Sequence, residues 1–447
     1  MVFAVGAGFC LFLLGSHFGH AHPVIILDID TLRADHLGCY GYQRDTSHWI
    51  DELASQGTVF EWAFAQAPNT PPSQASILTS LYPRTHGRVT GKDRLPEEVT
   101  TLAEVMQAGG FTTAAFVDGG YMAPHSGLSQ GFETYHSSKE GLKGLAALGP
   151  FVFDWVRKNK EENFLLLIHT YDVHTPYDPP PPFREIFLNG LEPSTPGFEP
   201  DTKTMKGVML RARQGELNQL TAADIEYSRA LYDGGIRYVD AWIGSFMELL
   251  RENGLLERAT IIVLSDHGEE FQEHGSVLHE KLYSTVTHIP LIIRPPGGMT
   301  ARRVDQVVES IDLMPTILDM VGLDEPQTPM EGTSLFPFFK RRPVSRLEGL
   351  GPAFGESPLF GGRVFVADGT HQMLQTRTTE VLELFDFRLD SKEQDDISQQ
   401  HPEVVGRLGS KIELFDQTSA DTSKYLPGVR AIDDQDLEDL RALGYVE

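Results

Sequence analysis

VIILDI, at residues 24–29, is an apolar run broken only by Asp28, and Asp30 follows it directly. Four similar runs occur later in the chain: FTTAAFV (111–117), FLLLIHT (164–170), TIIVLS (260–265) and PLIIRP (290–295). Short, mostly apolar runs of this kind are typical of strands that are covered on both faces. Segments with helical patterns separate them, so the sequence predicts an α/β fold with a central, largely parallel sheet.

The clearest helical segment begins at Thr221, whose hydroxyl stands in a capping-box arrangement with Asp224. Its apolar residues share one stripe at helical spacing, and Asn253–Gly254 is a typical helix end. The Gly234–Gly235 pair inside it weakens the helix by about 1–2 kcal/mol without changing that spacing. Shorter helices are predicted at residues 101–108 and 151–159, and long loops at 124–150 and 178–220.

The chain divides into three stretches of different character. Residues 1–22 are apolar through CLFLLG and contain no Lys or Arg, which predicts a signal peptide or an N-terminal membrane anchor, and hence an exported or anchored protein. Residues 23–340 hold the alternating strands and helices. In residues 341–447, RVFVADG, HQMLQT and VLELFDFRLD predict a smaller antiparallel sheet, so we expect a C-terminal subdomain there.

Composition limits the classes of partner. The 447 residues include 37 Lys and Arg against 63 Asp and Glu, a net charge of −26, which argues against nucleic acid or an anionic membrane surface as the main partner. An anionic substrate is still compatible, because a bound metal can invert the local field. The two cysteines, Cys10 and Cys39, exclude a disulfide scaffold and a Cys-rich zinc site.

Potential metal ligands gather at the carboxyl ends of three predicted strands: Asp28 and Asp30, then His169, Asp172 and His174, then Asp266 and His267. In open parallel sheets, ligands bind beyond these ends. Plainer interpretations exist, because an Asp after a strand often caps a helix and an Asp-His-Gly sequence often forms a turn. The mixture of carboxylate and imidazole at several strand ends nevertheless favours a metal site.

Thr70 is a candidate nucleophile. It precedes Pro71, Pro72 and a predicted helix at Ser73–Leu81, so it lies at or beside the N-terminus of that helix. The plainer interpretation is a helix N-cap. A threonine hydroxyl becomes nucleophilic when a metal or a base lowers its pKa, and the positive end of a helix stabilises the alkoxide. Thr70 beside a metal would meet both conditions.

These segments, taken together, resemble the sulfatase-like hydrolases of the alkaline phosphatase superfamily. The matching blocks occur in the family's order, as the opening LDIDTLRADHLGCYGYQRDTSHWIDELASQGTVFEWAFAQAPNTPPSQASILTSLYPRTHG (27–87), HTYDVHTPY (169–177), SDHGEEFQEHG (265–275), HIPLII (288–293), LFDFRLDSKEQDDIS (384–398) and LRALGYVE (440–447). The resemblance covers nearly the whole chain. It implies an alkaline phosphatase-like α/β/α sandwich, with a catalytic domain at 23–340, that hydrolyses ester bonds.

The resemblance also assigns a metal site and a nucleophile. It implies a divalent metal, which could be Ca, Mg, Mn or Zn, held by Asp30, Asp266 and His267 with Asp28 as a further candidate ligand. The nucleophile, which also contacts the metal, falls on Thr70. The family's sulfatases have Cys-x-Pro-Ser-Arg at this place, and the Cys, or a Ser in some members, becomes formylglycine. Threonine is not a precursor of formylglycine, so none is expected here.

A second departure from that motif is Gln74, which replaces the arginine. Phosphodiesterase, phosphonate-hydrolase and phosphotransferase relatives use a Thr directly as nucleophile, so the resemblance implies cleavage of a phosphodiester, phosphonate or sulfate ester through a covalent intermediate. His174 matches the family's DPHTPY-like block and could touch the transferred group or a second metal. His174 or His279 could protonate the leaving oxygen.

Other basic residues are candidate contacts for the substrate anion. His279 and Lys281 lie near the place where the family often has a Lys or His that touches the anion. Arg84 and His86 are further candidates. Each of these side chains could instead be an ordinary solvent-facing residue.

Two alternatives to the Thr-dependent hydrolase remain open at this point. One is a true sulfate ester hydrolase that uses an unmodified Thr. The other is a non-catalytic protein that binds an anionic glycan or lipid head group. The expected partner in every case is a small anionic ester or a sulfated or phosphorylated glycan or lipid. The intact set of Asp30, Asp266 and His267 favours an enzyme.

Overall fold

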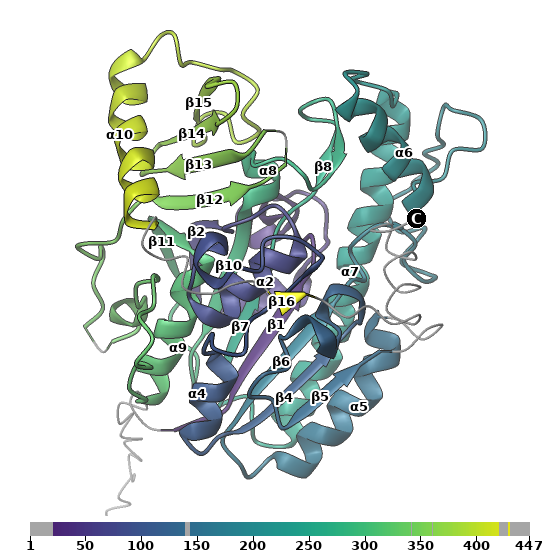
Figure 1. Cartoon of the computed structure of the whole chain (residues 1–447). Helices are drawn as coiled ribbons and strands as arrows, with labels where there is room; N and C mark the ends of the chain where they lie inside the picture. The colour runs from purple at the N-terminus through teal and green to yellow at the C-terminus, as the bar shows by residue number, and fades with distance from the viewer. Residues whose placement is uncertain (1–20, 139–143, 341, 360, 420–427, 430–447) are drawn as a thin grey trace, which may run out of the picture.

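An eight-stranded sheet runs through the centre of the computed structural model (Figure 1). The structure describes residues 21–138, 144–340, 342–359, 361–419 and 428–429. Nearly all of the predicted signal or anchor at residues 1–22 lies outside these residues, as does the LRALGYVE block. Among the helices that are described, none is both long enough and apolar enough to span a bilayer.

The strands of the central sheet follow the order β11-β2-β10-β7-β1-β6-β4-β5. Their bounds are Val24–Ile29 (β1), Thr58–Phe64 (β2), Thr112–Val117 (β4), Thr134–Ser137 (β5), Phe164–Thr170 (β6), Thr260–Leu264 (β7), His288–Arg294 (β10) and Arg302–Glu309 (β11). Every neighbouring pair is parallel except the two that involve β10, which is antiparallel to β2 and β7. The prediction of a largely parallel sheet is confirmed.

Three strands of the central sheet were not predicted, and two of them, β11 and β5, form its edges. The sequence of β11, RRVDQVVE, alternates charged and apolar residues, and β5 is partly exposed along its length. Edge strands face water and need no continuous apolar run. The third, β2, carries a half-buried Glu61–Trp62 pair in its middle. A search for buried apolar runs therefore finds only strands from the interior of the sheet.

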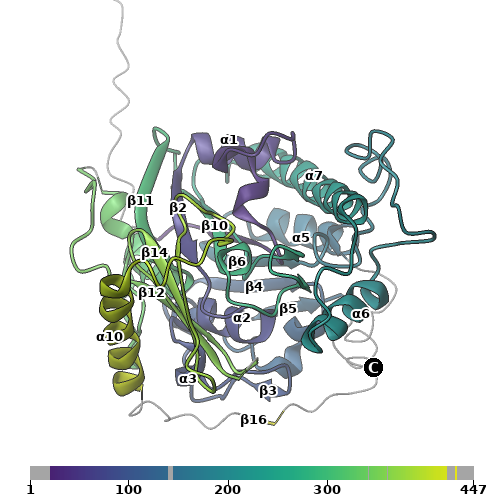
Figure 2. The ribbon, with the colours of Figure 1, turned by 90° about the horizontal axis from the view of Figure 1, so that it is seen from above.

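Helices cover both faces of the sheet (Figure 2). On one face, α1 (His48–Ser55), α5 (Gly144–Asn159) and α7 (Ala222–Glu252) pack against Ile25, Leu27 and Ile29 of β1. On the other, α2 (Thr70–Thr79), α4 (Leu102–Ala108) and α9 (Leu313–Val321) pack with Val24 and Ile26. Successive residues of a strand point to opposite faces, so β1 supplies both cores. The result is the expected α/β/α sandwich.

The helix start that was predicted from capping residues at Thr221 is confirmed. Thr221 and Asp224 form a capping box at the start of α7, which ends at Asn253. The Gly234–Gly235 pair lies inside this continuous helix, where an added Cβ would come within 3.0 Å of a backbone oxygen of the crossing segment that follows β6. The pair therefore lets α7 pack closely under the HTYDVHTPY block.

The two predicted long loops are partly helical. Helix α5 begins at Gly144 and contains Pro150, so its first turns fall in the segment expected to be a loop. Helix α6 (Thr202–Arg213) lies within the other, and the Asp201 side chain accepts a hydrogen bond from the Thr204 amide at its start. Sequence reasoning missed α6 because its apolar residues form only one short stripe among lysines and arginines.

A smaller antiparallel sheet follows, as predicted. It contains β12 (Ala353–Ser357), β13 (Arg363–Ala367), β14 (His371–Thr376) and β15 (Leu382–Asp386), in sequence order. One face packs against the central sheet around Phe64 and Val307, and the other is covered by α10 (Pro402–Ser419). The subdomain boundary at residue 340 stays a prediction.

Short elements complete the described fold. They are α3 (Pro83–His86), α8 (Ser284–Thr287), the pair β3 (Asp93–Arg94) and β16 (Gly428–Val429), the pair β8 (Glu270–Phe271) and β9 (Val277–Leu278), and 3-10 turns at Ala34–His36, Gly38–Tyr40, Gly120–Met122, Pro124–Ser126, Ser310–Asp312 and Phe336–Phe338.

Candidate active site

The carboxyl ends of β1, β6 and β7 bring the predicted metal ligands together. These three strands are adjacent and parallel, and Asp28 of β1 stands opposite His169 of β6 in the strand register. Asp30 follows β1, and Asp266 and His267 follow β7. All five side chains are buried. The sheet topology thus gathers three carboxylates and two imidazoles that are far apart in the sequence.

Helix α2 places a hydroxyl beside them. Thr70 is the first residue of α2, and Asn69 occupies the N-cap position. The Thr70 Oγ1 donates to Asp30 Oδ2 at 3.0 Å and lies 3.3 Å from His267 Nε2. The hydroxyl therefore faces the strand ends, and it does not cap its own helix. The helix N-terminus favours negative charge at this point.

Asp30, His169 and Asp266 form a group that could hold a metal ion. Each offers one ligand atom, and the three atoms lie within 4.8 Å of one another. Asp30 Oδ1, Asp266 Oδ2 and both ring nitrogens of His169 have no hydrogen-bond partner among the described residues. Buried polar atoms without partners are costly, and a cation would satisfy the two carboxylate oxygens and one nitrogen of His169. Carboxylates combined with imidazole suit Mn or Zn better than Ca.

The electrostatics of the group favour a cation as well. Burial raises the pKa of Asp28 to about 8, against the opposing effect of His169. Burial, followed by the neighbouring carboxylate of Asp266, raises the pKa of Asp30 well above its usual range. Crowded buried carboxylates resist ionisation because their charges repel and lack water. A divalent cation would reverse this, since it favours the charged form of each ligand.

His267 is held in a defined orientation. Its Nδ1 lies 3.0 Å from the Gly268 carbonyl oxygen, which leaves Nε2 facing Thr70 and, at 3.5 Å, Asp266 Oδ2. The following glycine is required by packing, because a Cβ on Gly268 would lie 2.3 Å from the Thr285 carbonyl oxygen. The turn after β7 thus directs one imidazole nitrogen into the group.

The positions of Asp28 and His169 differ from what the sequence predicted for the metal site. Asp28, predicted as a further metal ligand, accepts a hydrogen bond from Gln74 Nε2 at 2.6 Å and is not part of the three-residue group. His169, named among the potential ligands at the strand ends but absent from the set that the resemblance implies, belongs to it, with Nε2 3.5 Å from Asp30 Oδ2. Gln74, at the position of the family's arginine, thus binds a carboxylate behind the site.

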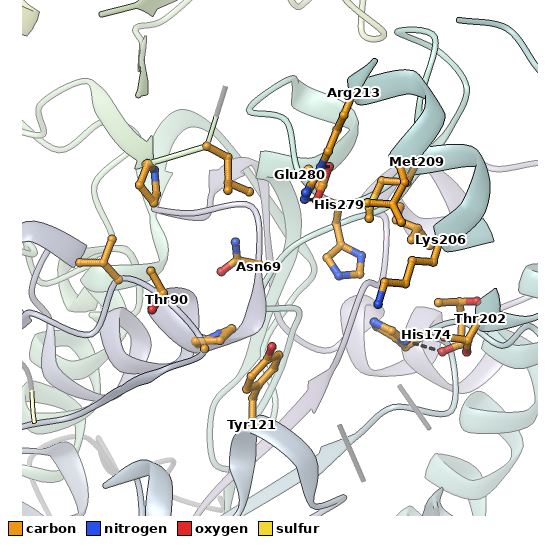
Figure 3. Close-up of a pocket in the computed structure, with 18 residues that line it drawn as sticks. Asn69, Thr90, Tyr121, His174, Thr202, Lys206, Met209, Arg213, His279 and Glu280 are labelled. Carbon is orange, nitrogen blue, oxygen red and sulfur yellow. Dashed lines mark hydrogen bonds and ion pairs between the residues drawn. The ribbon is translucent and has the colours of Figure 1, made fainter. Parts of the chain in front are cut away.

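A cavity of about 440 Å³ opens beside the group (Figure 3). Asn69 and Pro71, on either side of Thr70 in the chain, line it together with His174 and His279. The ring centroids of His174 and His279 are 5.0 Å apart, and those of His279 and His267 are 4.5 Å apart. The structure therefore brings both predicted catalytic histidines close to His267.

Burial determines the protonation of these histidines. It lowers the pKa of His174 to about 3 and that of His279 to about 4, so both rings are neutral at pH 7. Glu269 Oε1 lies 3.1 Å from His279 Nδ1, and burial raises the pKa of Glu269 to about 7. Sequence analysis did not select Glu269, although its place in SDHGEE, two residues after His267, was a usable signal. An anion in the cavity would favour the protonated imidazoles.

The other predicted anion contacts lie elsewhere. Arg84 is ion-paired with Glu356 and Asp416 and so joins α3 to the C-terminal part of the chain. His86 is buried, with Nε2 3.1 Å from Ser76 Oγ. Lys281 donates from Nζ to the His274 carbonyl oxygen. Among the described residues that line the cavity, none of these three occurs, so the structure does not bring them to the substrate side of the site.

The chain and its fold are similar to known proteins. Arylsulfatase K from Bos taurus is 25% identical over 440 residues, which cover 84% of this chain and 79% of the relative. A phosphonate monoester hydrolase from Agrobacterium radiobacter superposes with a TM-score of 0.73 and 20% identity over 92% of this chain and 100% of its own. A protein solved in complex with its substrate D-glucosamine-2-N,6-O-disulfate superposes with a TM-score of 0.74 and 18% identity, over 93% and 99%. At such identities the two solved structures establish the fold.

The class of protein follows from these likenesses and from the family's sequence profile. The chain is an ester hydrolase that acts on anionic esters. It belongs to the sulfatase family, whose profile matches residues 23–323. Members of this family generally bind a divalent metal, and the group of Asp30, His169 and Asp266 is the candidate site for it here.

Proposed function

We propose that the protein cleaves an anionic ester by direct attack of the Thr70 hydroxyl, through a covalent intermediate, with a divalent metal held by Asp30, His169, Asp266 and His267. The observation that carries the proposal is the position of Thr70 Oγ1, 3.0 Å from Asp30 Oδ2 and 3.3 Å from His267 Nε2. When bound, a divalent metal lowers the pKa of a hydroxyl beside it and screens the charge of the ester oxygens.

The residues around Thr70 suit it to act as the nucleophile. The hydrogen bond to Asp30 fixes the rotamer of the side chain, and the N-terminus of α2 stabilises negative charge that develops on Oγ1. Thr70 itself is buried, and its chain neighbours Asn69 and Pro71 line the cavity. The reacting group of the substrate would therefore approach the hydroxyl from the cavity.

One of the two histidines of the cavity would protonate the leaving group. In the first step, the Thr70 hydroxyl would give its proton to Asp30 Oδ2, to which it already donates, and a bond would form between Oγ1 and the phosphorus or sulfur atom while the bond to the leaving oxygen breaks. A bound anion favours protonation of His174 or His279, and one of these would give its proton to that oxygen. In the second step, water would give a proton to the same histidine and attack the same atom, while Thr70 leaves and regains its proton from Asp30.

We favour phosphodiester or phosphonate esters over sulfate esters as the reacting group. Thr70 cannot supply formylglycine, and the amide of Gln74 bonds to Asp28 where sulfatases have a guanidinium. Sulfate ester hydrolysis with an unmodified Thr is the second candidate, supported by the arylsulfatase relative. The alternative of a non-catalytic binding protein is not retained, because the chain is an ester hydrolase.

The proposal extends to the substrate and its compartment. The structural neighbour that binds a disulfated glucosamine supports a sulfated or phosphorylated glycan as the natural substrate. The apolar start at residues 1–22 supports export to the periplasm or the extracellular space, or anchoring to a membrane.

Hydrolysis of four matched aryl esters tests the proposal. We expect the metal-loaded protein to cleave the phosphodiester or the phosphonate faster than the aryl sulfate and the phosphate monoester. Thr70→Ala should lower kcat/KM by about 1,000-fold or more while metal content is unchanged. Thr79→Ala is the matched control, because this hydroxyl lies in the same helix and bonds only to the Ala75 carbonyl oxygen.

Mass spectrometry of the protein quenched during turnover should detect the transferred group on the peptide that contains Thr70. Full activity in Thr70→Ala, or a covalent adduct on another residue, would show that the nucleophile has been assigned wrongly.

A further inference from the structure

Helix α6 forms one wall of the cavity. The residues that it contributes are Thr202, Lys206, Met209, Leu210 and Arg213. Their spacing of three and four residues puts them along one side of the helix. Figure 3 shows Lys206 and Arg213 extending from α6 toward the cavity. This helix lies in the segment between β6 and α7, outside the sheet that carries the reacting residues.

The charged residues of the cavity leave one cation in excess. Arg213 is paired with Glu280, which also lines the cavity, so their charges offset one another. For Lys206, no carboxylate of the described chain lies within ion-pair distance. Lys206 therefore has a positive charge that a negative group of a ligand in the cavity could pair with.

Lys206 is also separated from the residues that would bind the reacting group. Thr70 and the metal group are fully buried at the carboxyl ends of the central strands, whereas Lys206 is half-buried on the outer helix. In Figure 3, Lys206 lies with His174 on the α6 side of the cavity, and Asn69, the neighbour of Thr70, lies on the other side of His279. A substrate that reaches Thr70 would thus extend past the histidines to the lysine.

We propose that Lys206 binds a second anionic group, a carboxylate, sulfate or phosphate, on the leaving part of the substrate. The preferred substrates are then esters that carry one negative group beyond the reacting one. The apolar walls at Met209, Leu210 and Leu278 suit a ring that joins the two groups, and a cavity of about 440 Å³ has the volume for such a ligand. This inference rests on the proposed function for the identity of the reacting group.

Kinetics on a pair of esters tests the role of Lys206. Both esters carry the same reacting group, of whichever ester class the enzyme cleaves. The leaving group is 4-hydroxybenzoate in one ester and the neutral 4-hydroxybenzamide in the other. We expect Lys206→Met to lower the ratio of kcat/KM values, benzoate over benzamide, about tenfold, mostly through KM. Lys206→Arg should keep the ratio, and Lys206→Glu should lower it further. Added salt should reduce the preference of the parent enzyme.

Lys203→Met is the matched control, because Lys203 is exposed on the same helix and does not line the cavity. It should leave the ratio unchanged. An equal loss on both esters in Lys206→Met would mean that Lys206 binds the reacting group, and no loss on either would mean that it binds neither. Both results would overturn the inference.

Direct binding separates this inference from the proposed function. The affinities of 4-hydroxybenzoate, 4-hydroxybenzenesulfonate, 4-hydroxyphenylphosphonate and 4-hydroxybenzamide are measured calorimetrically on the full-length parent protein and on Lys206→Met. We expect the parent to bind the three anions about tenfold more tightly than the amide, and the variant to bind all four compounds with similar affinity. The anion that the parent binds most tightly identifies the preferred group. Equal anion affinity in parent and variant refutes the role of Lys206 even when no ester is cleaved, whereas absence of cleavage refutes only the proposed function.

Discussion

Replacing His169 by leucine should weaken metal binding while leaving the rest of the site in place. His169 is completely buried, its Nε2 is 3.5 Å from Asp30 Oδ2, and neither ring nitrogen has another partner among the described residues. Leucine fills a similar volume and removes only the donor atoms. Loss of even an outer partner of a metal ligand weakens metal affinity by about 10- to 100-fold, so loss of a direct ligand should weaken it by about 100-fold or more.

The weaker metal binding can be measured as a loss of folding stability. A metal that binds only the folded chain stabilises it in proportion to the logarithm of its concentration over Kd, so a 100-fold weaker site loses about 2.7 kcal/mol of that stabilisation at saturating metal. The assay is urea unfolding of each protein with excess Mn²⁺ and with a chelator. The difference between the two conditions isolates the contribution of the metal, because any change in the metal-free protein cancels.

A matched control comes from another buried imidazole. His86→Leu removes a ring that bonds to Ser76 outside the metal group, so it should lower stability equally with and without Mn²⁺. A metal-induced stabilisation in His169→Leu as large as that of the parent would refute the assignment of His169 as a ligand.

Two further predictions concern pH and the substrate contacts. In metal-free protein, Asp28 has a pKa of about 8 when folded and an ordinary low value when unfolded, so its contribution favours folding at low pH and is lost as pH rises toward 8. Asp28→Asn should therefore flatten the fall in stability between about pH 5 and 8, by up to about 1.4 kcal/mol per pH unit, in urea unfolding at several pH values; an unchanged slope would contradict the raised pKa. Arg84→Met should lower stability by about 1–3 kcal/mol, because it leaves the Glu356 carboxylate without its guanidinium partner while Asp416 keeps Arg377, yet it should keep KM for small esters within about twofold. A large rise in KM would instead support the substrate contact that the sequence suggested.

The parts of the fold that could be predicted are those with a strong local signal. Strands β1, β6 and β7 are covered on both faces, and that burial requires the apolar runs from which they were predicted. Helix α7 was found from its cap and its stripe. Strand β11 and helix α6 were missed because each buries only one narrow side, so polar residues dominate their sequences.

The site shows the same division. Asp30, Thr70 and His267 follow strands or begin a helix, positions at which sequence alone indicates a function. The contact between Glu269 and His279 and the place of Lys206 on the cavity wall depend on how the chain folds around the cavity. Arg84 has the type and place of an anion contact, but its guanidinium is occupied by carboxylates from the C-terminal part of the chain.

The small C-terminal sheet has a consequence for how the enzyme could be shortened or recombined. Pro358 and Leu359, directly after β12, belong to the rim of the cavity, and Arg84 fastens the same region to α3. Trimming the chain after the main sheet would therefore open the substrate side to water as well as remove a buried apolar face. Excision or exchange of this portion between relatives should therefore alter which leaving groups are accepted.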